Sequence, residues 1–364
     1  MMHWQETARV LHSLGKLTKA GRGAVLATVV RIHGSVYRRP GAKLLVADDG
    51  VMDGSVSGGC LEADVREHAL NVMRTGIARL LHYDTGTDDT TPFGLGLGCN
   101  GAVDVFVQPA DTLQFRAAAA RMVTLLQGDG VFSISTVVAG EREPGLGALL
   151  VTGANGKLAG TTGDAALDRA IAARAAQAQT TGVSELYDLG RVRLFTEVLT
   201  PPPELLVCGG GGDAPPLVRF AAEAGFRVAV VDHRPAYLDG SRYPTGTRLI
   251  EARWDNASVA LPLGARTHAV VMTHSITHDR GWVQRLLASP VAYIGVLGPR
   301  ARLEDILRHI DVAGDERLFG PVGLDLGAEG PEQIALSIVA ELLGVWSRRE
   351  PGHLRERHGV IHAG

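Results

Sequence analysis

The back of the chain alternates short apolar runs with segments of helical periodicity. From residue 205 it reads LLVCGGGGDAPPLVRFAAEAGFRVAVVDHR: an apolar run, four glycines, a helical pattern, and a second apolar run that ends in an acid. Such runs are typical of strands buried in a parallel sheet. Further strands are predicted at 248–251, 268–273 and 291–297, and a helix is predicted from Gly330. The pattern predicts a Rossmann-like, doubly wound α/β domain over residues 204–346, followed by a C-terminal tail over 347–364.

The front of the chain has a different pattern, in which several strands precede each helix. Residues 4–20 show amphipathic helical periodicity. Strands are predicted at 24–32, 43–46, 52–56, 78–83 and 103–107. A helix is predicted from about Cys60 to Arg74, directly after the glycines of GSVSGGCLE. This order indicates an α+β unit over residues 1–110.

Residues 111–200 repeat the first unit in degenerate form. The segment GAKLLVADDGVMDGSVSGGCLEADV (41–65) is echoed by GALLVTGANGKLAGTTGDAALDRA (147–170). Self-similarity of this kind indicates duplication, so two related α+β units are expected. The three prolines at 201–203 are expected to form a stiff, extended linker to the Rossmann-like domain.

The two copies differ where the first copy carries its thiols. Gly58, Gly59 and Cys60 of the first copy have no counterparts of the same kind in the second copy, and the GLGLGCNG passage around Cys99 has no counterpart at all. Residues that only the shared fold needs should survive in both copies. The loss of both cysteines from the second copy therefore indicates a role beyond the fold.

The two cysteines of the first copy are the leading candidates for chemistry. Cys60 is expected at a helix N-terminus, where free N–H groups favour the thiolate and lower a thiol pKa. Cys99 lies in a glycine-rich loop whose backbone can approach a ligand. Two such thiols could bind a soft metal, carry sulfur or hold a thiolate-reactive cofactor; the alternative is that both are small buried apolar residues. Cys208, within an apolar strand, is expected in the core.

The glycine turn near residue 209 fits a nucleotide-binding pattern. Gly209, Gly211 and Ala214 match G-x-G-x-x-A, in which the glycines allow a tight turn and close approach to a pyrophosphate. The helix that follows would present N–H groups to an anion. Asp232 stands 23 residues beyond Gly209, where an acid would meet a ribose hydroxyl.

Three further candidates follow the carboxyl ends of the predicted parallel strands, where ligands of open α/β sheets bind. They are Arg234, His274 and Gly298. Arg234 could favour a 2′-phosphate or another anion. Prolines at 215 and 216 each remove an N–H from the first helical turn, so NAD(P) binding stays open.

Composition narrows the class of protein. The chain has 364 residues, 45% hydrophobic and 21% charged, which is ordinary for globular domains. A net charge of −3 implies no strongly basic face for nucleic acid. No apolar run approaches the length of a membrane span and the N-terminus does not resemble a signal peptide, so we expect a cytoplasmic protein without stable membrane insertion. In such a chain the three cysteines are expected to be thiols.

Several common sites are not supported. There is no C-x-x-C pair and no His/Cys cluster at zinc-ligand spacing. Walker and G-x-S-x-G sequences are also absent from the chain, which argues against a P-loop and against a serine hydrolase.

Motifs along nearly the whole chain resemble one family. In the front half they are GSVYRRPGAKLLV, GSVSGGCLEADV and GLGLGCNGAVDV; in the back half they are CGGGGDAPPLV, VVDHRP, VVMTHS, YIGVLGPR and GLDLGAEGPEQIALSIVAE. They resemble the XdhC/CoxI family, the accessory proteins of molybdenum hydroxylases such as xanthine dehydrogenase. There is one departure, because Gly212 stands where the family's glycine turn often has a histidine.

The resemblance implies a chaperone that binds molybdenum cofactor, a phosphorylated pterin dithiolene. Such a protein would protect the cofactor while a cysteine desulfurase partner replaces an oxo ligand with sulfide, and would then deliver it to the apo-hydroxylase. Carried onto this sequence, the cofactor-binding residues would be Cys60 and Cys99, which could meet the molybdenum, with Gly58, Gly59, Glu62, Arg38 and Arg39 around them.

A second function stays open beside this one. The Gly209 turn could hold NAD(P) in an oxidoreductase, with His274 as the acid–base group. That function would leave the thiols of the first copy without a role, so whether the protein is an enzyme is open, with an accessory role favoured. The oligomeric state is also open, and a homodimer is one alternative.

Overall fold

The structure is a computed structural model that describes residues 2–34, 38–84, 101–140, 145–312 and 314–358. The chain divides into two compact units, Met1–Pro201 and Pro202–Gly364. The division falls within the predicted proline linker.

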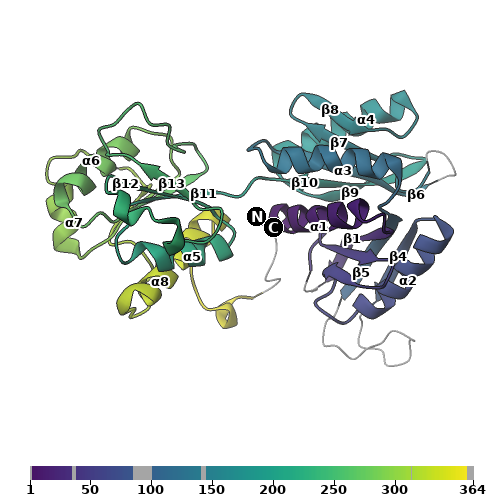
Figure 1. Cartoon of the computed structure of the whole chain (residues 1–364), viewed down its shortest axis with the longest axis horizontal. Coiled ribbons are helices and arrows are strands. Elements are labelled where there is room, and N and C mark those ends of the chain that lie inside the picture. Colours follow the sequence, from purple (N-terminus) through teal and green to yellow (C-terminus); the bar gives the residue numbers. More distant parts are fainter. Residues whose placement is uncertain (1, 35–37, 85–100, 141–144, 313, 359–364) are drawn as a thin grey trace. The chain divides into compact units, whose positions relative to one another are not determined.

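The N-terminal unit contains two copies of one strand and helix order (Figure 1). The first copy is formed by α1 (Met2–Lys19), β1 (Ala24–Gly34), β2 (Lys43–Ala47), β3 (Met52–Gly54), α2 (Glu62–Thr75), β4 (Arg79–Asp84) and β5 (Gly101–Pro109). The second is formed by α3 (Leu113–Leu126), β6 (Phe132–Gly140), β7 (Leu149–Gly153), β8 (Gly156–Gly160), α4 (Ala165–Thr181), β9 (Glu185–Asp188) and β10 (Val192–Leu199). The sheets run β3-β2-β1-β5-β4 and β8-β7-β6-β10-β9, the same order twice, as a duplication predicts.

Strand register fixes which residues of the two copies are equivalent. Thr28 of β1 pairs with Lys43, and Thr136 of β6 pairs with Leu149, so Lys43 and Leu149 occupy equivalent places. On the other side of the same strands, Leu26 pairs with Gln108 and Ile134 pairs with Glu197. Gln108 and Glu197 are therefore equivalent as well.

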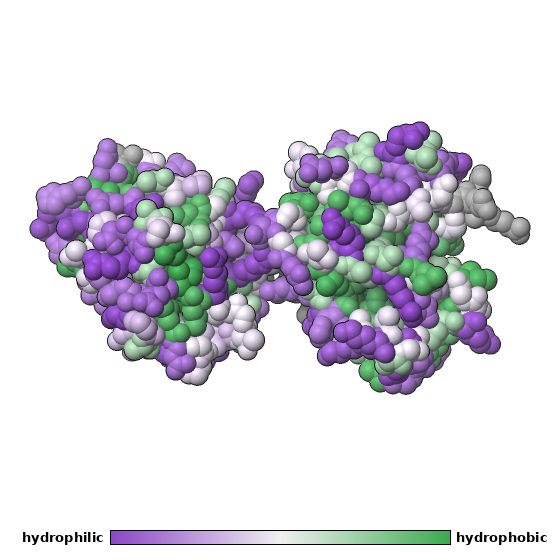
Figure 2. Space-filling model, turned by 45° about the horizontal axis from the view of Figure 1, so that its top comes forward, coloured by the Kyte–Doolittle hydropathy of each residue, from purple (hydrophilic) through white to green (hydrophobic). Residues whose placement is uncertain are grey.

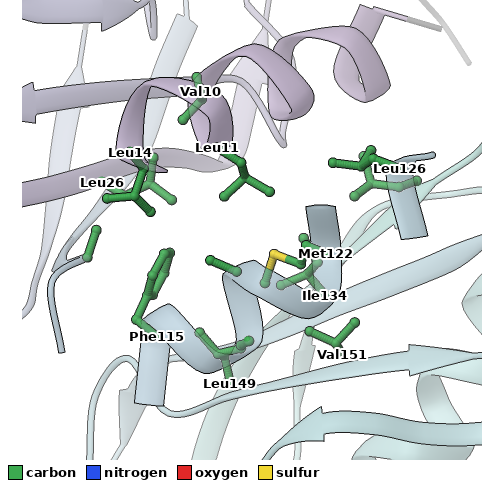
Figure 3. Close-up of a cluster of buried hydrophobic side chains, with 14 of the residues drawn as sticks. Val10, Leu11, Leu14, Leu26, Phe115, Met122, Leu126, Ile134, Leu149 and Val151 are labelled. Carbon is green, nitrogen blue, oxygen red and sulfur yellow. The ribbon is translucent and has the colours of Figure 1, made fainter. Parts of the chain in front are cut away.

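The main core of this unit lies between the two sheets. Helices α1 and α3 contact each other and the inner strands, while α2 packs on the first sheet and α4 on the second (Figure 1). Leu11 and Leu14 of α1, Phe115 and Met122 of α3, and Leu149 of β7 meet in one buried cluster (Figure 3). Because this cluster draws on both copies, the hydrophobic effect holds them together as one folded unit.

The C-terminal unit is a doubly wound α/β domain, as predicted. Its strands are β11 (Glu204–Cys208), β12 (Arg227–Asp232), β13 (Arg248–Glu251), β14 (Thr267–Val271), β15 (Tyr293–Val296) and β16 (Leu318–Phe319). Its helices are α5 (Ala214–Glu223), α6 (Ile276–Leu287), α7 (Arg300–Leu307) and α8 (Gly330–Ser347), with short 3-10 turns η1 (Pro235–Tyr237), η2 (Gly240–Arg242) and η3 (Leu354–Glu356). All neighbouring strands are parallel, in the order β13-β12-β11-β14-β15-β16. Cys208 is fully buried in the core of this sheet, which confirms the expectation for that thiol.

Hydrophilic side chains are spread over the visible surface of both units, with apolar residues between them (Figure 2). Among the described residues, no helix combines the length and the apolar character needed to cross a bilayer.

Candidate functional site

Cys60 lies in a glycine turn at the surface of the first copy. Gly58 has a φ of 93° and Gly59 a φ of 126°, a left-handed conformation that a side chain with a Cβ adopts only with strain. The expected place of Cys60 in the first helical turn is wrong. Helix α2 begins at Glu62 with Leu61 as its N-cap, so the thiol precedes the helix and is exposed to solvent.

The Glu62 carboxylate holds this turn. Oε1 accepts hydrogen bonds from Ser55 Oγ (2.7 Å) and from the N–H groups of Val56 (3.1 Å) and Ser57 (3.0 Å). Oε2 accepts from Ser57 Oγ and from the Gly59 N–H (2.9 Å). Burial alone would raise the pKa of the Glu62 carboxyl, but the hydrogen bonds from Ser57 and Ser55 outweigh it and lower that pKa to about 2. All of these donors belong to the turn itself.

Asp168 has the same role in the second copy. Its carboxylate accepts from Thr161 Oγ1 at 2.8 Å and from Thr162 N–H at 2.8 Å. These donors lie 106 positions after Ser55 and Val56, just as Asp168 lies 106 positions after Glu62. Burial raises the pKa of the Asp168 carboxyl, and bonds from Lys157 and Thr162 lower it by more, to well below its usual range. An acid that survives in both copies is needed for the shared fold, so the structure gives the carboxylate of Glu62 a structural role.

What distinguishes the copies is the backbone around Cys60. In the second copy, α4 begins at Ala165, capped by Asp164, whose side chain accepts from the N–H groups of Ala166 and Leu167. Position 165 corresponds to Gly59. The first copy therefore leaves three residues before Glu62 outside its helix, and Cys60 is one of them.

The predicted arginines lie beside this turn. Arg38 pairs with Glu6 of α1 and donates from Nε to the Ser55 carbonyl at 3.1 Å. In the second copy Gln114, on α3, donates directly to the equivalent carbonyl of Thr161 at 2.6 Å. Arg38 thus supports the strand that leads into the turn, whereas Arg39 is exposed. A cofactor-binding role for either arginine stays a prediction.

Cys99 lies outside the described residues. Within the described part of the chain, no group of three or more His, Cys, Asp or Glu side chains is placed to hold a metal ion.

The glycine turn of the C-terminal unit has the predicted tight geometry. Gly209 follows β11 with a φ of 117°, and a Cβ there would lie 2.6 Å from the Met272 carbonyl oxygen. A Cβ at Gly211 would lie 3.3 Å from the His274 ring. Ala214, the first residue of α5, is fully buried against the sheet. The three small residues therefore serve close backbone packing, as the motif predicts.

Asp232 binds the turn rather than standing open to a ribose. Oδ2 accepts from the Gly210 N–H and from Arg234 Nη2, both at 2.8 Å, and Oδ1 accepts from the backbone N–H and Nε of Arg234, both at 2.9 Å. Burial raises the pKa of the Asp232 carboxyl, but the bonds from Arg234 and Gly210 outweigh it and lower the pKa to about 2. Both oxygens are occupied, so this arrangement does not fit a ribose hydroxyl unless Arg234 moves.

The remaining candidates gather at the same edge of the sheet. His274 follows β14 with a φ of 63°, and its Nε2 lies 3.3 Å from Asp213 Oδ2. Gly298 follows β15 with a φ of 128°, and a Cβ there would lie 2.6 Å from Arg302 Cδ. Arg302 reaches back to the buried Asp279 at 2.6 Å. These contacts place the predicted residues at one edge; binding by them stays a prediction.

Sequence reasoning missed Arg242. From a 3-10 turn, its guanidinium donates to the carbonyls of Gly210 (2.8 Å), Tyr237 (2.9 Å) and Gly211 (3.1 Å). An arginine that caps carbonyls 31 and 32 positions away has no local sequence signal. Ser55 and Ser57 were also missed, although both lie within the GSVSGG motif.

Comparison with known proteins places the chain in a family. A model of the XdhC and CoxI family matches residues 17–84, and a model of the XdhC Rossmann domain matches residues 205–342. A Bacillus subtilis protein, named for a probable role as part of xanthine dehydrogenase, is 32% identical over 88% of this chain and 92% of its own length. The chain belongs to the XdhC and CoxI family.

Two further similarities bear on this family. A crystal structure described as a xanthine dehydrogenase from Bacillus halodurans matches with a TM-score of 0.75 and 28% identity, over 94% of this chain and 96% of that one. The molybdenum cofactor insertion chaperone PaoD of Escherichia coli is 40% identical, over 23% of this chain and 26% of PaoD. As in the XdhC proteins, the chain joins an XdhC/CoxI part to an XdhC Rossmann domain.

Proposed function

We propose that this protein is an accessory chaperone that binds molybdenum cofactor and inserts it into a molybdenum hydroxylase of the xanthine dehydrogenase type. Membership of the XdhC and CoxI family supports this role, and the names of the Bacillus subtilis relative and of PaoD point in the same direction. The observation that carries the proposal is the exposed thiol of Cys60, held on a glycine turn that the second copy lacks.

The chemistry of the turn suits this cargo. A thiolate is a soft ligand, and soft ligands bind molybdenum or handle sulfur better than carboxylates do. An exposed thiol on a short turn can reach the metal of a cofactor bound to the surface of the first copy. In the proposed sequence, a cysteine desulfurase supplies the sulfur while the cofactor is held, and the apo-hydroxylase then takes the cofactor.

The test is anaerobic ultrafiltration of the protein with freshly released molybdenum cofactor. We expect wild type to retain molybdenum and pterin together, and Cys60→Ala to lose most of that retention. Ala166→Ser, at the equivalent place in the second copy, is the matched control and should retain both. Equal retention by Cys60→Ala and wild type would overturn the role of this thiol, and no retention by wild type would overturn the carrier function. Cys99→Ala belongs to the same series.

The alternative is a nicotinamide-dependent oxidoreductase. The strand order and the Gly209 turn favour it, but the Asp232 carboxylate is committed to Gly210 and Arg234. Fluorescence titration with NADH and NADPH separates the two functions. Saturable binding that Gly209→Val abolishes would support the alternative, and its absence would remove it.

A further inference from the structure

A pocket of about 410 Å³ lies in the second copy, away from the cysteine turn. The residues that line it come from β5, the start of α3, and the loops before β7 and after β8. They are Gly76, Gln108, Pro109, Thr112, Gln114, Phe115, Gly145, Leu146, Gly147, Ala148, Leu149, Thr161, Thr162 and Gly163. Its volume falls in the range of small-molecule sites.

The pocket is the second-copy equivalent of the region that Arg38, Lys43 and Ser55 form in the first. Gly147 and Thr161 lie 106 positions after Gly41 and Ser55. The first-copy region is occupied by charge, because Lys43 Nζ donates to the Gly41 carbonyl and pairs with the buried Glu197. A Cβ at Gly41 would lie 3.2 Å from His3 Nδ1, so the His3 ring is also there.

In the second copy both charges are gone. Leu149 stands where the first copy has Lys43, and Gln108 stands where the second sheet has Glu197. Gln108 is 5% exposed, and none of the hydrogen bonds among the described residues involves its carboxamide. A buried amide without a partner costs free energy, and a ligand that supplies the partner recovers it.

Gly147 keeps this amide accessible. Its φ is 84°, and a Cβ at this position would lie 2.9 Å from Gln108 Oε1. The absence of a side chain leaves space beside the carboxamide on the pocket side. The other polar groups of the lining are hydroxyls, the Gln114 amide and the backbone of the loop, with Phe115 and Leu149 as carbon-rich walls.

We infer that this pocket binds an uncharged bicyclic lactam of the purine or pteridine type. None of the fourteen lining residues is charged, so a phosphate or carboxylate would be desolvated there without a counterion. A carboxamide offers one acceptor and two donors, and can make paired hydrogen bonds to the edge of a heterocycle, as glutamine does with adenine. The site shares no residue with the Cys60 turn, so the inference stands apart from the proposed function.

The test is isothermal titration calorimetry of the full chain with hypoxanthine and with 2-amino-4-oxopteridine, with inosine monophosphate as the charged comparison. We expect saturable binding of at least one neutral probe and much weaker binding of the monophosphate. Gln108→Leu should weaken binding about tenfold, since it removes the paired hydrogen bonds. Cys60→Ala should bind the neutral probe as wild type does.

A second variant protects the test against misfolding of Gln108→Leu. Leu146 lines the pocket and is 41% exposed, so Leu146→Arg places a large cation in the pocket wall without disturbing the core. It should also weaken binding about tenfold or more. The inference is overturned if neither neutral probe binds wild type, if Leu146→Arg binds like wild type, or if the monophosphate binds as tightly as the neutral rings.

Discussion

Glu62 and Asp168 accept equivalent hydrogen bonds in the two copies of the N-terminal unit: each binds a hydroxyl and the next residue's backbone N–H in the turn before its helix. Charge-assisted bonds of this kind are each worth about 1.5–3 kcal/mol. We predict that Glu62→Gln and Asp168→Asn each lower the free energy of unfolding by about 2 kcal/mol. Only Glu62→Gln should change the alkylation rate of Cys60, because only that turn carries a thiol. Urea unfolding and peptide mass spectrometry measure the two effects.

The same carboxylate predicts a pH dependence. The folded pKa of Glu62 is about 2, below its ordinary 4.5, so its contribution to stability is present above pH 4.5 and is lost as the pH falls towards 2. The difference in melting temperature between wild type and Glu62→Gln should therefore shrink over that window. A difference that stays constant down to pH 2 would show that ionisation of Glu62 is not what holds the turn.

The conformation of the glycine turn gives a third prediction. Gly59→Ala places a Cβ in open space but at a φ of 126°, so only backbone strain opposes it, about 1 kcal/mol. Gly163→Ala, in equally open space at a φ of 85°, is the matched control. We expect similar losses of stability from both variants, measured by urea unfolding, and weaker cofactor retention from Gly59→Ala alone. If Gly163→Ala impaired retention equally, the Cys60 turn would not be special.

The buried ion pair between the copies gives a fourth. Lys43→Leu leaves Glu197 buried without its partner, which should cost about 3–5 kcal/mol of stability. The double variant Lys43→Leu/Glu197→Gln recreates the Leu149 and Gln108 pair of the other copy. It should be more stable than Lys43→Leu alone, and a double-mutant cycle by urea unfolding measures the coupling. Simple additivity of the two single losses would contradict the structural equivalence.

Much of the fold could be predicted from periodicity. Apolar runs and glycine positions locate the parallel strands because a buried strand needs continuous apolar residues and a tight turn needs glycine. The repeat could be found because the glycines at 41, 50 and 54 return at 147, 156 and 160. At Gly54 and Gly160 a Cβ would lie 2.2 Å and 2.0 Å from a backbone carbonyl oxygen, so the sheet itself requires them.

The candidate site was less accessible to sequence reasoning. Glu62 stands within a motif that carries a thiol, and nothing local shows that its oxygens face the backbone instead of a ligand. Asp232 has the spacing of a ribose-binding acid, but Arg234, two residues on, occupies it. The equivalence of Gln108 with Glu197 depends on strand register, which sequence identity between glutamine and glutamate positions does not reveal.

The unequal pairs Lys43–Glu197 and Leu149–Gln108 have a consequence for how the duplication was used. Two identical chains around a true two-fold axis must carry the same residues at both equivalent places, so a change that suits one place is forced on the other. Joining the copies in one polypeptide removes that constraint. One side could become charged and closed while the other became neutral and open, a division of labour that a symmetric dimer cannot reach by point substitution.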